Sequence, residues 1–287
     1  MAEAYEQFDL PSAQFDELYG HIFLPGETKK RLVSQILLEF SLRKHAALAP
    51  LPIHGLVVLV GPPGTGKTSL AKGAASKAAA LLKGKGSRLL VVDPHSLTSS
   101  ALGKSQREVK RFFDETVNEC AGHGPLIVLL DEVETMATSR ARMSLEANPV
   151  DVHRATDAVL ASLDSVADRH PNVVFVATSN FPEALDDAFT SRADLVLDIG
   201  MPVQEARGEI IRDTLDVLGR EWPRVKKLGT NGHVEELAKV SDGMDGREIR
   251  KRILHALALD AGVALDPSKL KFAGLLQAFG SGREGCE

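Results

Sequence analysis

The segment GPPGTGKT, residues 61–68, has the pattern of a loop that binds phosphate groups. Its glycines let the backbone curl so that successive N–H groups point inward, and a helix that begins near Lys67 adds the positive end of its dipole. The Lys67 ammonium can then reach the β- and γ-phosphates of a nucleotide, and the Thr68 hydroxyl can coordinate Mg²⁺. The residues expected to contact the nucleotide here are Gly61, Pro62, Pro63, Gly64, Thr65, Gly66, Lys67, Thr68 and Ser69.

Two adjacent carboxylates follow a second apolar run, in the segment PLIVLLDEVE at residues 125–134. Asp131 is suited to hold a Mg²⁺ ion and its water shell, and Glu132 to orient and deprotonate an attacking water. Acidic residues after a strand are commonly just a solvated loop, but the phosphate loop upstream favours a catalytic role. The pair therefore predicts hydrolysis of a Mg²⁺-bound nucleotide.

Three further polar residues follow in an order that favours hydrolysis over nucleotide binding alone. Asn180 ends the segment NVVFVATSN, where its short side chain can position a water beside the γ-phosphate. Arg192 cannot easily fold back onto its own nucleotide, but it can reach the γ-phosphate of a neighbouring subunit. Arg247 follows Gly246 at an expected helix start, where it can touch the phosphates bound by its own subunit. The alternative is a loop cap and two surface arginines.

Apolar runs that alternate with helical patterns predict the elements that position these residues. Strands alternating with helices are typical of an α/β fold with a doubly wound parallel sheet, which binds ligands at the carboxyl ends of its strands. A helical pattern at 28–45 precedes the first run, and others occupy 105–120 and 152–167. The expected strands are 56–60, 88–92, 126–130, 173–177 and 195–199.

After Pro202 the pattern is helical only, which predicts a small all-helical lid domain at the C-terminal end. Its expected helices are 204–218, 234–240 and 247–261. We therefore expect three parts in the chain. They are a lead-in segment at 1–27, a large α/β nucleotide-binding domain at 28–201 and the helical lid at 202–287.

The composition is that of an ordinary globular protein: 287 residues, 44% hydrophobic and 25% charged. The net charge of −5 provides no overall basic field for nucleic acid. No apolar run approaches the length of a membrane span, the first residues do not resemble a secretory signal, and only two cysteines occur. We expect a reduced, cytoplasmic protein. Cys120 and His123 lack a second ligand pair, so they indicate a helix end rather than a zinc site.

The set formed by the phosphate loop, the acidic pair, Asn180, Arg192 and Arg247 resembles the AAA+ ATPases. The segments LPSAQFDELY, DEVETMATSRAR, VVFVATSNFPEALDDAFTSRADLVLDIGMP and GMDGREIRK resemble the pachytene checkpoint protein 2 family (thyroid receptor-interacting protein 13), from about residue 10 to 270. The resemblance implies a ring, usually a homo-hexamer, that binds ATP and Mg²⁺ at subunit interfaces. It also adds Ile22 to the expected nucleotide contacts.

The family remodels HORMA-domain proteins, so the resemblance implies an ATP-driven remodeller that threads such a protein and releases it from its partner. Only about nine residues precede the matching region here, whereas eukaryotic members carry a separate N-terminal adaptor domain. The chain is therefore similar to the short bacterial form, whose relatives accompany HORMA proteins and cyclic-oligonucleotide synthases in anti-phage defence. A negative regulator of that signalling is the expected role.

One segment departs from the family pattern, in the loop expected to grip the threaded chain. Where the family commonly shows an aromatic residue after HSL, this chain has residues 98–103, TSSALG. Leu102 is the only sizeable apolar side chain in this loop, so we expect grip to rest on it, with residues 138–148 as the alternative.

Two other function classes compete with the remodeller. A DNA-acting AAA+ ATPase, such as a helicase loader or clamp loader, is disfavoured by the acidic net charge, because the basic clusters at 83–88 and 247–252 are short enough to be solvated faces. A nucleotide-switched scaffold with little turnover is disfavoured by the intact Glu132. Binding to a HORMA protein, to DNA or to neither distinguishes the three.

Overall fold

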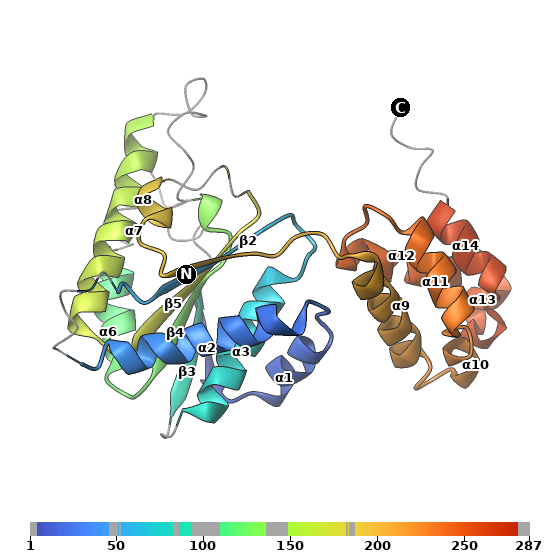
Figure 1. Cartoon of the computed structure of the whole chain (residues 1–287), viewed down its shortest axis with the longest axis horizontal. Helices are drawn as coiled ribbons and strands as arrows, with labels where there is room; N and C mark the ends of the chain where they lie inside the picture. The colour runs from blue at the N-terminus through green and yellow to red at the C-terminus, as the bar shows by residue number, and fades with distance from the viewer. Residues whose placement is uncertain are drawn as a thin grey trace. The chain divides into compact units, whose positions relative to one another are not determined.

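The structure is a computed structural model that describes residues 5–45, 51, 53–82, 86–92, 110–135, 149–181, 183 and 187–280. The chain divides into two compact units, which are described separately (Figure 1). Unit 1 comprises Met1–Tyr19, Pro25–Pro62 and Lys67–Ile199, and unit 2 comprises Gly20–Leu24, Pro63–Gly66 and Gly200–Glu287. The three-part division expected at residues 27 and 201 stays a prediction.

Unit 1 is built on a six-stranded sheet in the order β1-β3-β4-β5-β2-β6. The five neighbouring strands β3, β4, β5, β2 and β6 are parallel. Strand β1 pairs antiparallel with β3 at one edge of the sheet. This architecture confirms the predicted α/β fold with a doubly wound, mostly parallel sheet. The strands are β1 (Tyr5–Leu10), β2 (Leu56–Val60), β3 (Ser87–Val92), β4 (Leu126–Leu130), β5 (Val173–Ser179) and β6 (Leu195–Asp198).

The central strands are apolar throughout because both of their faces are covered. Every residue of β2, β4 and β5 is buried, so the alternation of a half-exposed strand is absent. Figure 1 shows α1, α2 and α3 on one side of the strands and α6 and α7 on the other. These helices are α1 (Ala13–Gly20), α2 (Gly26–Leu42), α3 (Lys67–Leu81), α6 (Asn118–Ala121) and α7 (Pro149–Arg169).

Short elements complete unit 1. A π-helical stretch, η2 (Phe112–Val117), interrupts the helix expected at 105–120, of which residues 110–120 are described. A 3₁₀ turn, η3 (Val133–Thr135), follows β4, and the four-residue helix α8 (Asp187–Thr190) precedes β6. None of the described helices is long and apolar enough to cross a membrane.

The part of unit 2 that follows residue 200 is helical, as the sequence predicts. Its core contains buried apolar side chains from α9, α11, α12 and α14, and Phe23 packs against it from the short segment 20–24. The helices are α9 (Gln204–Leu218), α10 (Pro223–Lys226), α11 (Asn231–Val240), α12 (Gly246–Ala258), α13 (Ala261–Leu265) and α14 (Phe272–Gly280), with a 3₁₀ turn η5 at Pro267–Lys269.

The strand order explains why the chemically interesting residues meet. In the sheet, β5 lies between β4 and β2, and the three strands are parallel. The residues that follow these strands therefore lie at the same end of the sheet. The segments after β2, β4 and β5 are the phosphate loop, the acidic pair and Asn180 respectively. Parallel strands therefore bring three separate sequence motifs to their common carboxyl ends.

Candidate active site

The phosphate loop leaves β2 through glycine backbone conformations that a side chain would disturb. Gly61 has a φ of +146°, and a Cβ built on it would lie 2.2 Å from the carbonyl oxygen of Ile199. Lys67 begins α3 and is buried, and its Nζ donates to the carbonyl oxygens of Gly61 at 2.9 Å and Pro62 at 2.8 Å. The loop's own carbonyls thus hold an ammonium group at the mouth of the helix, where a phosphate would be bound.

In unit 2, the rest of the loop lies against the segment that contains Ile22. Gly66 has a φ of +90°, and a Cβ built on it would lie 2.7 Å from Ile22 Cδ1. Any side chain at position 66 would therefore be both strained and in collision with Ile22. Loop residues 63–66 thus form a tight backbone turn, and the Ile22 side chain packs directly on that turn.

The start of α12 also lies beside the loop within unit 2. A Cβ built on Gly64 would lie 2.2 Å from an oxygen of Asp245, whose carboxylate caps α12 by accepting from the Glu248 N–H at 2.8 Å. Arg247 is exposed in the first turn of this helix. Within unit 2, the start of the helix that carries Arg247 therefore lies beside loop residue Gly64, although no hydrogen bond or ion pair to Arg247 among the described residues assigns it a role.

Thr68 and Asp131 come together, as a shared metal site requires. The Thr68 hydroxyl donates to Asp131 Oδ1 at 2.8 Å, and the Thr178 hydroxyl donates to the same oxygen. A hydroxyl and a carboxylate at this separation suit Mg²⁺, which takes oxygen ligands in an octahedron and obtains most of them from water and phosphates. No group of three or more acidic, histidine or cysteine side chains that could bind a metal occurs within the described residues. The Thr68 hydroxyl and the Asp131 carboxylate fit a Mg²⁺ ion that is bound together with a nucleotide.

Glu132 has an unusual backbone conformation that directs its side chain. It has a φ of +56°, the left-handed region that a non-glycine residue rarely adopts, and its N–H donates to the Thr178 hydroxyl at 3.0 Å. The side chain is exposed at the carboxyl end of the sheet, and Asn180 Nδ2 donates to Glu132 Oε1 at 3.2 Å. A carboxylate that is open to solvent and oriented by an amide is well placed to accept a proton from water.

The backbone of Asn180 is fixed by a carboxylate that the sequence analysis did not identify. The Asn180 N–H donates to Oε1 of Glu134 at 3.1 Å, and Glu134 is buried with 7% of its surface exposed. Glu134 therefore positions Asn180, which in turn contacts Glu132.

Arg192 lies at the other end of the sheet from these groups. It precedes β6, where the Asp194 N–H donates to the Leu56 carbonyl at the first residue of β2. The five residues of β2 separate that level from the phosphate loop, a distance of roughly 16 Å at about 3.3 Å per residue. Arg192 is instead paired with Asp164 of α7, whose two carboxylate oxygens accept from Arg192 Nε, each at 3.1 Å. Arg192 therefore lies away from the phosphate loop of its own subunit, and its role at a neighbouring subunit's nucleotide stays a prediction.

The sequence analysis missed Thr178, Glu134 and Asp164, and the available signals differ among them. Thr178 is a hydroxyl residue that follows five apolar residues in β5, and it lies two residues before Asn180 and hence on the same side of the chain. A hydroxyl residue at the end of an apolar run could have been recognised in the sequence as a candidate site residue. Glu134 and Asp164 have none, because their roles depend on the turn after β4 and on the packing of α7. The loop at residues 98–103, with Leu102, and its alternative at 138–148 lie outside the described residues.

The chain is similar in sequence to a family of ATPases and to several known proteins. The AAA family, ATPases associated with various cellular activities, matches residues 57–201. The chain is 48% identical over 274 residues to CD-NTase-associated protein 6 of Pseudomonas aeruginosa, a match that covers 96% of this chain and 90% of that protein. It is 32% identical over 278 residues to the human pachytene checkpoint protein 2 homolog, covering 88% of this chain.

The same relationship appears in solved structures. The structure of C. elegans PCH-2 matches with a TM-score of 0.77 and 25% identity, covering 96% of this chain and 74% of that one. A chain from the E. coli MS115-1 HORMA:CdnC:Trip13 complex also matches with a TM-score of 0.77, but at 21% identity it supports the fold alone. The chain spans 64% of the human pachytene checkpoint homolog and 62% of the C. elegans protein, so it corresponds to part of each.

Proposed function

Since the chain belongs to the AAA family of ATPases and is a homologue of the pachytene checkpoint protein 2 group, we propose that it hydrolyses ATP to remodel HORMA-domain proteins. The observation that carries the enzymatic part is the meeting of Thr68, Asp131, Glu132 and Asn180 at the carboxyl ends of the strands, joined by hydrogen bonds. Acid, amide and hydroxyl groups in that arrangement suit attack of water on a phosphate.

Nucleotide binding is assigned to the phosphate loop and its neighbours. The loop N–H groups and Lys67 hold the β- and γ-phosphates, and Lys67 exchanges its two carbonyl partners for phosphate oxygens. Thr68 and Asp131 hold the Mg²⁺ ion. When bound, that ion neutralises charge that develops on the phosphate oxygens.

Hydrolysis is assigned to Glu132 and Asn180. Glu132 accepts a proton from the water that attacks the γ-phosphorus, the bond from that phosphorus to the bridging oxygen breaks, and ADP and phosphate leave. Asn180 holds the Glu132 carboxylate and the water in line, since its amide already donates to Glu132 Oε1. The Thr178 hydroxyl fixes the backbone of Glu132 by accepting a hydrogen bond from its N–H.

We assign Arg192 and Arg247 to neutralising the negative charge of the γ-phosphate. Because Arg192 precedes β6 at the far end of the sheet, it acts on the nucleotide of the adjacent subunit in a ring, which we propose to be a hexamer. Arg247 contacts the phosphates of its own subunit from the start of α12, the helix end that lies beside the loop.

The proposed partner is a HORMA-domain protein in complex with a cyclic-oligonucleotide synthase. The name of the Pseudomonas relative records an association with a CD-NTase, and a chain of similar fold comes from a complex that contains HORMA and CdnC proteins. Turnover in the ring then pulls the HORMA protein and releases it from its partner. This activity, in the ATP-containing cytoplasm, would switch off anti-phage signalling and make the protein a negative regulator.

A trapped ring tests this proposal against the DNA-acting alternative. Glu132→Gln keeps the metal site but removes the proton acceptor, so we expect it to bind ATP, hydrolyse it at least about 100-fold more slowly, and retain a HORMA protein in an ATP-dependent pull-down. Glu119→Gln, which changes an exposed glutamate remote from the site, should behave as wild type. Capture of DNA in place of a HORMA protein would support the clamp-loader or helicase-loader class, and wild-type hydrolysis by Glu132→Gln would remove Glu132 from the mechanism.

A further inference from the structure

Strand β1 forms one edge of the sheet in unit 1 and pairs on one side only, with β3. Its six residues keep one unbroken register, from Tyr5 opposite Val92 to Leu10 opposite Ser87, so the pairing contains no bulge. The sequence of the strand, YEQFDL, contains no proline and no lysine. Bulges, prolines and lysines are the devices by which edge strands commonly avoid pairing with other chains. β1 therefore lacks these protections.

The hydrogen bonds of β3 show which backbone groups of β1 point outward. The N–H of Arg88 donates to the carbonyl of Pro125, directly before β4, at 3.0 Å. Near the other end of the pair, the carbonyl of Val92 accepts from the N–H of Asp131, directly after β4, at 3.1 Å. Every second residue of β3, beginning with Arg88, thus has its N–H and C=O toward β4. The residues between them have these groups toward β1.

The antiparallel register carries this alternation over to β1. The even-numbered residues of β1 lie opposite the residues of β3 that face it, so they exchange hydrogen bonds with β3. The odd-numbered residues have their backbone N–H and C=O directed away from the sheet. These residues are Tyr5, Gln7 and Asp9. Within the described residues, no backbone–backbone hydrogen bond outside the pairing with β3 engages Gln7 or Asp9. β1 thus offers alternating donors and acceptors to an added strand.

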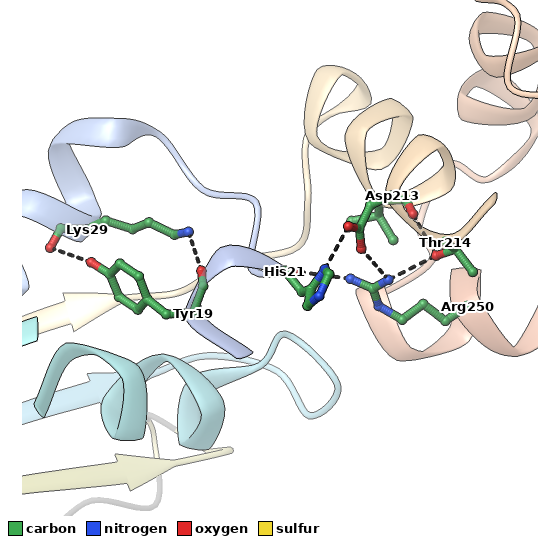
Figure 2. A network of polar contacts seen from close by, with 7 residues as sticks. Tyr19, His21, Lys29, Asp213, Thr214 and Arg250 are labelled. Carbon is green, nitrogen blue, oxygen red and sulfur yellow. Dashed lines mark hydrogen bonds and ion pairs between the residues drawn. The ribbon is translucent and has the colours of Figure 1, made fainter. Parts of the chain in front are cut away.

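Helices of unit 1 hold this edge in place. The rings of Phe8 in β1 and Phe15 in α1 pack edge to face, with their centroids 5.1 Å apart. The other end of α1 is fixed to α2, because Lys29 Nζ donates to the Tyr19 carbonyl at 2.7 Å and the Tyr19 hydroxyl donates to the Lys29 carbonyl at 3.2 Å (Figure 2). A strand that adds to β1 therefore meets an edge that is already ordered, which lowers the cost of binding.

The charges on this edge decide which kind of segment can pair with it. Glu6 is exposed, and 92% of the Asp9 side chain is exposed even though Arg88 Nε lies 3.9 Å from it. A second copy of β1 would bring the same carboxylates to the edge, and any other acidic segment would meet the same repulsion. Lysine or arginine side chains on an added strand would instead lie beside Glu6 and Asp9, where opposite charges across a strand pair are favourable.

We propose that the outer side of β1 is a docking edge for an extended, basic segment of a partner protein, which adds to the sheet as a further strand. The backbone groups of Tyr5, Gln7 and Asp9 provide the hydrogen bonds, and the carboxylates of Glu6 and Asp9 select the basic segment. This site goes beyond the proposed function, because it uses none of the residues assigned to ATP.

Fluorescence polarisation with a short labelled peptide that alternates lysine with valine tests the docking edge. The same peptide with every amide N-methylated keeps its charge but has no N–H to donate. We expect the unmodified peptide to bind at least about tenfold more tightly, because strand addition depends on main-chain hydrogen bonds whereas attraction to an acidic surface does not.

Two variants separate the hydrogen bonds from the charge. Gln7→Pro removes an outward N–H and leaves the hydrogen bonds between β1 and β3 in place, since proline is tolerated where the N–H of an edge strand faces solvent. Asp9→Lys reverses one charge of the edge. Each should weaken binding of the unmodified peptide about tenfold and leave ATP turnover unchanged. Glu221→Lys, which reverses an exposed charge in unit 2, is the matched control and should change neither.

Three results would overturn the inference. Equal binding of the two peptides would show attraction by charge alone. Peptide binding that both Gln7→Pro and Asp9→Lys leave unchanged would place the peptide on another surface. Failure of the peptide to bind, together with a change in subunit number in Gln7→Pro, would assign the edge to contact between copies of the chain. If Gln7→Pro unfolds, the comparison of the two peptides on the wild-type protein, with Asp9→Lys, decides.

Discussion

At the scale of single residues, the site depends on a backbone that is held in a costly conformation. Glu132 adopts a φ of +56°, which costs a non-glycine residue about 1–3 kcal/mol in general. The hydrogen bond from its N–H to Thr178 and the contact from Asn180 to its carboxylate offset that cost. The proposed proton acceptor is therefore held at its backbone and at its carboxylate before a substrate binds.

Thr178 is the residue whose removal should separate binding from chemistry. Thr178→Val keeps the shape but removes the hydroxyl that donates to Asp131 and accepts from the Glu132 N–H. We expect the turnover number to fall about tenfold or more, and the unfolding free energy to fall by about 1 kcal/mol, because the partly buried Glu132 N–H loses its acceptor. ATP affinity in the absence of Mg²⁺ should remain near wild type. An unchanged turnover number would show that Thr178 does not position the catalytic pair.

The residue scale also shows which site groups can be predicted from sequence. The loop at 61–68 and the Asp131–Glu132 pair are local patterns whose chemistry follows from composition and spacing, and the structure brings Thr68 and Asp131 into contact. Glu134 and the Asp164 partner of Arg192 depend on which elements meet in three dimensions. Their roles are properties of strand order and helix packing that no local spacing encodes.

At the scale of elements, the apolar strands were predictable and the edge strand was not. The runs at 56–60 and 126–130 are buried on both faces and coincide with β2 and β4. β1 reads YEQFDL, with only Leu10 buried, because it borders the sheet and pairs on one side only. An edge strand of this kind lacks the apolar signal on which the prediction depended, so residues 5–10 read as a polar lead.

The helix α2 contains a buried acid that links stability to pH. Burial, together with the negative charge of nearby Asp194, raises the pKa of the Glu39 carboxyl to about 7 from its ordinary value of 4.5, and Glu39 is 1% exposed. The unfolded chain loses this proton near pH 4.5, whereas the folded protein keeps it until about pH 7. This stabilising contribution is therefore complete below pH 4.5 and is lost as the pH rises to about 7 and beyond.

Replacement of this acid gives a prediction at the same scale. Glu39→Gln stays neutral at every pH, so it should equal wild type within about 1 kcal/mol at pH 4 and exceed it by up to about 3 kcal/mol at pH 8. Denaturant unfolding of both proteins at several pH values measures this difference. A stability difference that does not change between pH 4 and pH 8 would show that Glu39 ionises normally in the folded state.

At the scale of the whole molecule, we propose that each subunit completes the active site of its neighbour. Arg192 is separated from its own phosphate loop by the length of β2 and is held by Asp164. We therefore propose that Lys67 and Arg192 serve different active sites in a ring. Variants of these two residues should compensate for each other when they are combined.

Mixing two inactive proteins tests this requirement. Lys67→Ala loses the cation that binds the triphosphate, and Arg192→Ala loses the group that acts across the interface, so each alone should retain at most about one per cent of wild-type turnover. In mixed rings, some interfaces pair an intact loop with an intact arginine, and ATP hydrolysis should return to a measurable fraction of wild type. Absence of rescue in rings shown to contain both variants would reassign Arg192 to a structural role.

The most direct test of the central claim is the rate at which a fluorescently labelled HORMA protein leaves its bound partner. With wild-type protein and ATP, we predict that fluorescence energy transfer between HORMA protein and partner is lost many times faster than the spontaneous rate, and that ADP or Glu132→Gln with ATP gives no acceleration. If the protein hydrolyses ATP while the labelled complex dissociates only at its spontaneous rate, ATP turnover is not coupled to HORMA remodelling and the account is wrong.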